Sequence, residues 1–247
     1  MTEDFSPSTY RALLERLVAL GYTARSYEDA EPARADLIVR HDIDMSLQVA
    51  AETALIEQAL GIRAVYFVLL QTEMYNALSR MGREAIHRIL SLGHEVGLHF
   101  DASDQTDVGM MDRAAQSECR ILEEVTERPI RVISFHRPAP HLLGLEAPVA
   151  GRIHTYMPRF FTEMGYCSDS QGRWRFGHPF GHPAVAERRA LQLLTHPIWW
   201  QVPAALDPVA RLERFSAVRR ALLEKELAAN CLPFRDHHEA TRQREQT

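Results

Sequence analysis

Cysteine is scarce in this sequence, with three residues in 247. Cys119, Cys167 and Cys231 lie far apart, and their odd number does not suit a disulfide framework. This usage is typical of reduced thiols in a reducing compartment, so we expect a cytoplasmic protein. The first residues are acidic and polar, and no apolar run with a small-residue cleavage site follows them, so we expect no signal peptide.

Long apolar runs and an excess of basic charge are also absent. No stretch approaches the roughly 18 apolar residues of a membrane span, so none is predicted. The formal net charge is −5, with 28 Lys and Arg against 33 Asp and Glu, and this mild acidic balance argues against a nucleic-acid partner. Hydrophobic residues make up 46% of the chain, which excludes a disordered protein and predicts a globular one.

Short apolar segments alternate with longer helical patterns over most of the chain. Runs rich in β-branched or aromatic residues predict strands at 36–40, 64–70, 95–100, 130–135, 166–168 and 191–195. Helical spacing of apolar residues predicts helices at 45–60, 83–92, 107–126, 157–164 and 206–229. This alternation favours a parallel sheet, either open or closed into a barrel. We find no repeat or linker, so we predict one domain over 1–247, with a frayed polar tail over 235–247.

Polar side chains follow four of the predicted strands at the point where each strand ends. These strand ends read His41-Asp42-Ile43-Asp44, His99-Phe100-Asp101, His136-Arg137-Pro138 and Thr195-His196-Pro197. The carboxyl ends of parallel strands meet on one side of a sheet, and that side holds the site in parallel α/β folds. We therefore expect these side chains to converge on one functional site.

Two pairs of these residues have a spacing that suits a metal ion. Asp42 and Asp44 lie two residues apart, so in an extended segment both side chains point the same way. Two carboxylates that face one centre repel each other unless a cation or a proton lies between them. His99 and Asp101 have the same spacing and can converge on a metal in the same way. The alternative is that the first pair caps the following helix and that Asp101 is solvated.

The order of these motifs resembles that of the polysaccharide deacetylase superfamily, the NodB-homology domain of carbohydrate esterase family 4. The resemblance extends over 37–200, the motif core. The five segments that carry it are His41-Asp42-Ile43-Asp44, GHEVGLH ending at His99, Phe135-His136-Arg137-Pro138, Ser168-Asp169-Ser170 with Trp174, and Leu194-Thr195-His196-Pro197. It implies an α/β fold of the distorted (β/α)7-barrel type in a single domain.

The resemblance also implies roles for individual residues. Asp42 would be the catalytic base, His196 the general acid, and Arg137 the residue that orients Asp42. Asp44 and His99 would bind one divalent metal ion, with zinc favoured. The residues expected to contact substrate are Asp169 and Trp174, together with Trp199, which would line a sugar-stacking wall unless it packs in the core.

One position departs from the pattern of the family. The second motif has another histidine ligand four residues after His99, where this sequence has Ser103. We predict Asp101 as the third metal ligand, from the next inward-facing position of its strand. His136, on the neighbouring strand, is the other candidate. Otherwise the site would be weakened or empty.

The activity that the resemblance implies is hydrolysis of an N-acetyl group, or of a related linear amide C–N bond, on a sugar or sugar-containing precursor. The substrate would be a small molecule or an oligosaccharide, with a water on the metal as the nucleophile. Three alternatives stay open. The first is a barrel that binds sugar or acts as a scaffold without catalysis, which the presence of Ser103 favours. The second is a mononuclear Fe(II) oxygenase built on His99, Asp101 and His196. The third is a hydrolase of a small cyclic amide or ureide.

Overall fold

The computed structural model of the chain describes residues 4–103, 107–201 and 207–245. The chain separates into two compact units, residues 1–205 and residues 206–247. The motif core at 37–200 lies wholly within the first unit. The expectation of one domain over 1–247 stays a prediction.

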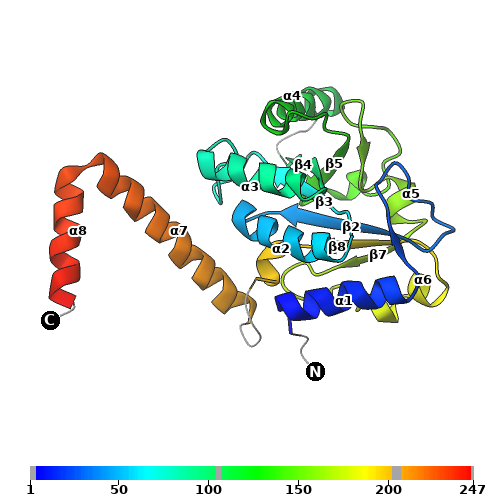
Figure 1. Cartoon of the computed structure of the whole chain (residues 1–247). Coiled ribbons are helices and arrows are strands. Elements are labelled where there is room, and N and C mark those ends of the chain that lie inside the picture. The colour runs from blue at the N-terminus through cyan, green and yellow to red at the C-terminus, as the bar shows by residue number, and fades with distance from the viewer. Residues whose placement is uncertain (1–3, 104–106, 202–206, 246–247) are drawn as a thin grey trace. The chain divides into compact units, whose positions relative to one another are not determined.

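The first unit is built on a curled parallel sheet that forms a half-barrel (Figure 1). Its strands are β1 (Thr23–Ala24), β2 (Asp36–Ile43), β3 (Val65–Leu69), β4 (Glu95–Asp101), β5 (Val132–His136), β6 (Ile153–His154), β7 (Gly165–Ser168) and β8 (Leu191–Thr195). The order across the sheet is β6-β5-β4-β3-β2-β8-β7, with β1 added beside β2, and each of these pairs is parallel. The prediction of a distorted (β/α)7-type barrel is confirmed.

The four longer helices of this unit pack side by side in chain order. They are α1 (Pro7–Ala19), α2 (Leu47–Ala59), α3 (Arg80–Ser91) and α4 (Val108–Thr126), and each contacts the next. A side-chain oxygen precedes each helix and accepts a hydrogen bond from the backbone N–H three residues further on, which satisfies one of the free donors of the first turn. These capping residues are Ser6, Ser46, Ser79 and Asp107.

Short elements replace long helices in the later part of the unit. They are η1 (Pro140–Leu142), α5 (Pro158–Phe161), η2 (Pro179–Gly181), α6 (Pro183–Ala186) and η3 (Pro197–Trp199). Each has a proline in its first turn, where the missing N–H costs nothing and the fixed φ already suits a helix. The prediction of a helix over 157–164 is met only by the four residues of α5.

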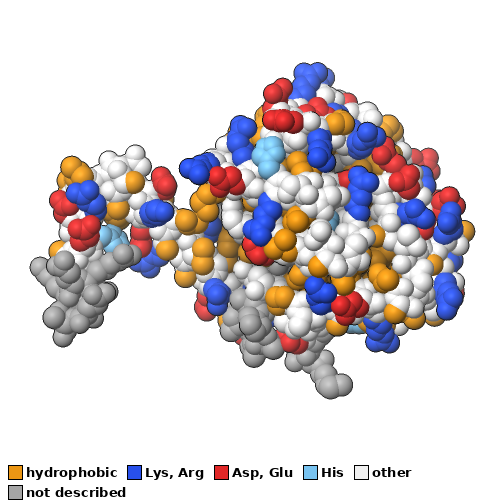
Figure 2. Space-filling view, viewed as in Figure 1, with side chains coloured by type: hydrophobic (Ala, Val, Ile, Leu, Met, Phe, Trp, Pro, Cys, Tyr) orange, Lys and Arg blue, Asp and Glu red, His pale blue; other side chains and the backbone are white. Residues whose placement is uncertain are grey.

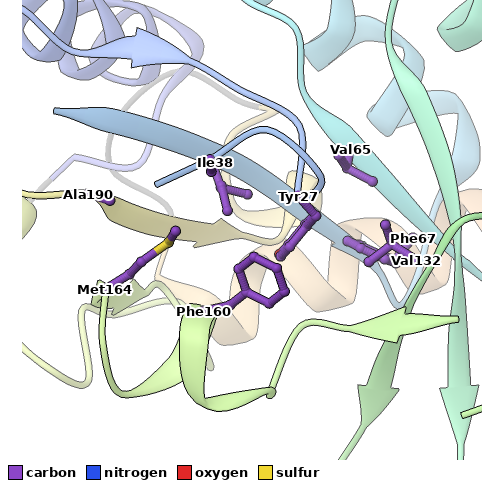
Figure 3. Close-up of a cluster of buried hydrophobic side chains, with 9 residues drawn as sticks. Tyr27, Ile38, Val65, Phe67, Val132, Phe160, Met164 and Ala190 are labelled. Atoms are coloured by element: carbon purple, nitrogen blue, oxygen red, sulfur yellow. The ribbon is translucent and has the colours of Figure 1, made fainter. Parts of the chain in front are cut away.

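Alternate residues of β2 point into the barrel, and they change in character from one end of the strand to the other. Ile38 belongs to an apolar cluster at one level of the interior (Figure 3). Arg40 and Asp42 follow it toward the carboxyl end, and both are buried. The cluster consists of Tyr27, Ala30, Ile38, Val65, Phe67, Val132, Phe160, Met164 and Ala190. The barrel interior is thus closed by apolar packing below and becomes polar toward the strand ends.

Gly97 on β4 makes room for this packing. A Cβ atom at that position would lie 2.5 Å from Cε1 of Phe67 and 2.8 Å from the backbone oxygen of Val132. No side chain fits in that space, so glycine allows the aromatic ring of β3 to lie against the backbone of β4.

The second unit consists of α7 (Pro208–Asn230) and α8 (Leu232–Glu245). The helix predicted at 206–229 corresponds to α7, which Asp207 caps by accepting a hydrogen bond from the backbone of Ala210. Residues 235–245 lie within helix α8, and the expectation that the tail over 235–247 is frayed stays a prediction. The sequence of this segment contains Arg, Glu, Gln and Ala, which are good helix formers. The predicted tail also includes 246–247, which lie outside the described residues.

Within the described part of the chain, no helix is long and apolar enough to cross a membrane. Basic and acidic side chains are interspersed over the face of the molecule seen in Figure 2.

Candidate active site

The carboxyl ends of β2, β4, β5 and β8 border one pocket of about 380 Å³. The structure brings seven of the predicted site residues to its wall, and these are Asp42, Asp44, His99, His136, Arg137, His196 and Trp199. The parallel arrangement of the strands explains this convergence, because it places all their carboxyl ends on the same side of the sheet.

Asp42 is held by an ion pair with Arg40, two residues earlier on the same face of β2. The guanidinium Nε lies 2.9 Å from Oδ1 and Nη2 lies 2.7 Å from Oδ2. Nη2 also donates to Ser134 Oγ at 2.6 Å, and this hydroxyl is 3.2 Å from Oδ1 of Asp42. Burial disfavours the charge of the Asp42 carboxylate, but Arg40 and His99 outweigh burial and lower its pKa below the ordinary value. Asp42 therefore stays ionised.

Arg137 is predicted to orient Asp42, but the guanidinium that pairs with Asp42 in the structure is that of Arg40. Arg137 follows β5 with a φ of +49° and has an exposed side chain at the pocket wall, while Arg40 supplies the guanidinium from inside the barrel. Arg40 is not among the predicted site residues, although the sequence contains a signal for it. An arginine inside an apolar strand needs a buried partner, and the two-residue spacing puts Arg40 and Asp42 on one face.

Asp44, His99 and His136 form a group that could hold a metal ion. One donor atom from each residue lies within 4.8 Å of the others. His99 Nδ1 donates to the backbone oxygen of Ser134 at 3.3 Å, since a carbonyl oxygen can only accept. In the neutral ring, Nε2 then presents a lone pair 3.1 Å from Oδ1 of Asp44 and 3.8 Å from Oδ2 of Asp42. A histidine lone pair beside two carboxylate oxygens fits a bound cation.

His136 is oriented by Asp101, which lies directly opposite it in the register of β4 and β5. His136 Nδ1 donates to Oδ2 of Asp101 at 2.9 Å, and Oδ1 accepts from the backbone N–H of Ser103 at 2.9 Å. Although burial raises the pKa of Asp101, the hydrogen bonds from Ser103 and His136 prevail and lower it to about 2. A carboxylate behind a ligand histidine fixes the tautomer and leaves Nε2 free to bind a metal.

This arrangement distinguishes the two candidates for the third ligand. In the part of the chain that the structure describes, Asp101 is not a member of the group of possible ligands, and the other candidate, His136, is. The Fe(II) oxygenase alternative also loses its carboxylate, because it needs Asp101 beside His99 and His196.

His196 is paired with Asp169, the first residue after β7. Its Nδ1 donates to Oδ1 of Asp169 at 2.6 Å and its backbone N–H lies 3.0 Å from both carboxylate oxygens. Trp200 Nε1 donates to Oδ2 at 2.6 Å. Burial lowers the pKa of His196, but the charge and hydrogen bond of Asp169 prevail and raise it to about 9. The other ring nitrogen, Nε2, lies 3.8 Å from Oδ2 of Asp44.

The three residues predicted to contact substrate have different positions. Asp169 is 0% exposed and accepts a hydrogen bond from His196, and its predicted contact with substrate stays a prediction. Trp174 packs its ring against Phe5 and Trp200, with ring centroids 6.0 Å apart in both pairs, and lies outside the pocket wall. Trp199 is buried and does line the pocket.

A second buried polar network lies on the other face of β2. His41 Nε2 is 2.5 Å from Oε1 of Glu57, and its Nδ1 is 2.8 Å from Thr195 Oγ1. Tyr66 donates to Oε2 of Glu57 at 2.6 Å, and Tyr10 donates to Oε1. Burial would raise the pKa of Glu57, but His41 outweighs it and lowers the pKa. This network ties α1, α2, β3 and β8 to the strand that carries Asp42.

Glu118 is a buried carboxyl group on α4. It accepts a hydrogen bond from Gln71 Nε2 at 2.6 Å, and its Oε2 has no hydrogen-bond partner among the described residues. Burial raises the pKa of Glu118 to about 7. The hydrogen bond from Gln71 opposes this shift, and the charge of Asp101 adds to it. The charged form is thus less stable in the folded chain than in the unfolded one.

The free energy of unfolding is therefore expected to fall as the pH rises from about 4.5 through about 7, because Glu118 keeps its proton to a higher pH in the folded chain than in the unfolded one. Glu118→Gln should remove this dependence and stabilise the fold by about 1–3 kcal/mol at pH 8, with little effect at pH 4.5. Urea unfolding at both pH values measures the difference. Glu124→Gln, at an exposed position of the same helix, is the control. Equal pH dependence in Glu118→Gln and wild type would contradict the expectation.

Comparison with known proteins gives matches to solved structures. No family model matches the chain, and no curated protein matches it. The solved structures that it resembles include members of carbohydrate esterase family 4. The Streptococcus pyogenes deacetylase PplD in complex with acetate is 12% identical, with 84% of this chain and 85% of that chain covered and a TM-score of 0.45.

Two further structures of this kind are similar at the same level. IcaB from Ammonifex degensii is 16% identical, with 64% of this chain and 81% of that chain covered and a TM-score of 0.45. A family 4 pseudoenzyme from Bacillus anthracis is 11% identical, with 75% and 62% covered and a TM-score of 0.42. These likenesses concern the fold alone.

Proposed function

We propose that this chain is a metal-dependent hydrolase that removes an N-acetyl group, or cleaves a related linear amide C–N bond, on a sugar or sugar-containing precursor. The observation that carries the proposal is the convergence of three groups on one pocket. They are the ion-paired carboxylate of Asp42, the ligand group around Asp44 and His99, and the protonated ring of His196. Amide hydrolysis needs a base, a Lewis acid and a general acid. The resemblance of the sequence motifs to those of polysaccharide deacetylases supports an amide on a sugar.

Asp44, His99 and His136 would hold the metal. A divalent cation bound there, with zinc favoured by two nitrogen ligands and one oxygen ligand, would polarise the amide carbonyl and lower the pKa of a water molecule. Asp101 contributes by fixing the ring of His136, and the backbone of Ser134 fixes the ring of His99.

Asp42 is the proposed base. Its carboxylate takes a proton from the water whose oxygen adds to the carbonyl carbon. Arg40 keeps this carboxylate ionised and, together with Ser134, fixes its direction, because both oxygens of Asp42 accept hydrogen bonds from inside the barrel. Arg40 is thus a positioning residue, in the role that the sequence predicted for Arg137.

His196 is the proposed acid. Its Nε2 gives a proton to the nitrogen of the amide as the C–N bond breaks, so the products are acetate and a free amine. Asp169 holds Nδ1 and so directs Nε2 toward the pocket. The raised pKa of His196, about 9, means that the ring carries its proton at neutral pH.

Hydrolysis of N-acetylated sugars by the zinc-loaded protein tests this proposal. Acetate and new primary amine are measured together over a panel of mono- and oligosaccharides. We expect equal amounts of both products, and His196→Asn should lower kcat by about 10²–10⁴-fold. His87→Asn, at an exposed position on α3, is the matched control. Acetate without amine, no release from any sugar of the panel, or full activity in His196→Asn would contradict the proposal.

A further inference from the structure

The charges around the pocket do not balance. The carboxylates in its wall are those of Asp42 and Asp44. Arg40 neutralises the first of them from beneath the pocket through two hydrogen bonds. The second faces His99 and, in the proposed enzyme, a divalent cation. The acidic groups at the inner end are therefore compensated.

Two further charges at the wall have no such partner. Arg137, after β5, and Arg175, after β7, both line the pocket with exposed side chains. Among the described residues, no carboxylate forms an ion pair with either guanidinium. The remaining charged pairs at the pocket, His196 with Asp169 and His136 with Asp101, each contain their own carboxylate. The outer wall is thus positive in a chain whose formal net charge is −5.

Two residues of this wall have an unusual backbone conformation. Arg137 has a φ of +49° and Gln171, which also lines the pocket, has a φ of +63°. Non-glycine residues rarely adopt this left-handed region, and residues in such conformations gather at active sites and ligand-binding sites. The backbone N–H of Arg175 donates to the oxygen of Ser168 at 3.2 Å, which ties this segment to the end of β7.

We infer that Arg137 and Arg175 bind an anionic group of the substrate, so that the preferred substrate is an N-acylated sugar that carries a phosphate or a carboxylate. The inference rests on the proposed function for the fate of the amide, but the anion site is independent of catalysis. Guanidinium groups suit both anions because they donate parallel N–H groups to two oxygens. The cavity of about 380 Å³ is large enough for one sugar ring with such a substituent.

Kinetics with matched substrates test the site. We compare N-acetylglucosamine with its 1-phosphate, its 6-phosphate and the corresponding N-acetylated uronic acid. The zinc-loaded wild type should prefer one of the charged sugars by about tenfold or more in kcat/KM, and Arg137→Gln and Arg175→Gln should each reduce that preference by about tenfold, mainly through KM. The two phosphates and the uronic acid distinguish the kind of anion. Arg173→Gln is the control, since Arg173 is exposed and lies outside the pocket wall.

Binding to a catalytically impaired variant separates this inference from the proposed function. Calorimetric titration of His196→Asn with the same sugars should show binding of the charged sugar that Arg137→Gln or Arg175→Gln weakens in this background. Such binding without hydrolysis by the wild type would overturn the proposed function and leave the anion site standing. Equal kcat/KM for neutral and charged sugars, unaffected by either arginine substitution, would overturn the anion site.

Discussion

Asp42→Asn is expected to keep the metal and to lower kcat for amide hydrolysis by about 10²–10⁴-fold. An amide cannot take a proton from the attacking water, whereas the three proposed metal ligands, Asp44, His99 and His136, are untouched. The measurement is acetate release by the zinc-loaded variant beside its metal content. Loss of turnover with full metal content is the result that fits a base.

This variant also changes a buried ion pair, so its fold needs a check. Asp42→Asn leaves the guanidinium of Arg40 beside a neutral group, with Ser134 as a remaining partner. A second variant, Arg40→Met with Asp42→Asn, removes both charges and avoids the unpaired cation. Turnover should be lost in both variants, with far-ultraviolet circular dichroism as the measure of folding. Wild-type turnover in either folded variant would rule out Asp42 as the base.

Arg40→Met is expected to destabilise the protein by about 3–5 kcal/mol, because it leaves the Asp42 carboxylate buried without its cation. The lowered pKa of Asp42 in the folded wild type stabilises the fold above the unfolded pKa of this residue, and this stability is lost as the pH falls through the folded value. Arg40→Met should abolish this contribution, so its destabilisation should be largest near neutral pH. Urea unfolding at pH 7 measures it.

Arg137→Met is the matched control for this effect. The side chain of Arg137 is exposed, and Asp42 has its ion pair with Arg40, so we expect a change within about 0.5 kcal/mol. A large loss of stability in Arg137→Met together with a small one in Arg40→Met would show that Asp42 is held by Arg137, as the sequence motif predicts, and not by Arg40.

The sheet could be predicted from the sequence because its strands are short apolar runs that end in polar residues. The predicted strand at 191–195 coincides with β8, and the strand predicted at 36–40 is the first part of β2, which continues through His41 and Asp42 to Ile43. The strands β1 and β6 have two residues each, too few for a pattern. Helix α1 was missed although its buried residues have helical spacing, at Tyr10, Leu13, Leu14 and Leu17.

The position of the site could be predicted, but its pairings could not. Strand ends converge by topology alone, whereas the pairing of Asp101 with His136 depends on the register of β4 against β5. The pairing of Asp169 with His196 depends on β7 lying beside β8, with Leu194 opposite Ser168. A single sequence does not determine either strand register. The pair of Arg40 and Asp42 was within reach, since it needs only the alternation of one strand.

Metal content tests the central claim most directly. Wild-type protein is incubated with zinc, dialysed and measured by elemental mass spectrometry beside Asp44→Ala, His99→Ala and His136→Ala, with His87→Ala as the control. The expected result is roughly one divalent ion per chain in the wild type and the control, and its loss in the three variants. A wild type that binds no metal, or a His136→Ala variant that keeps it fully, would contradict the site built from these three residues.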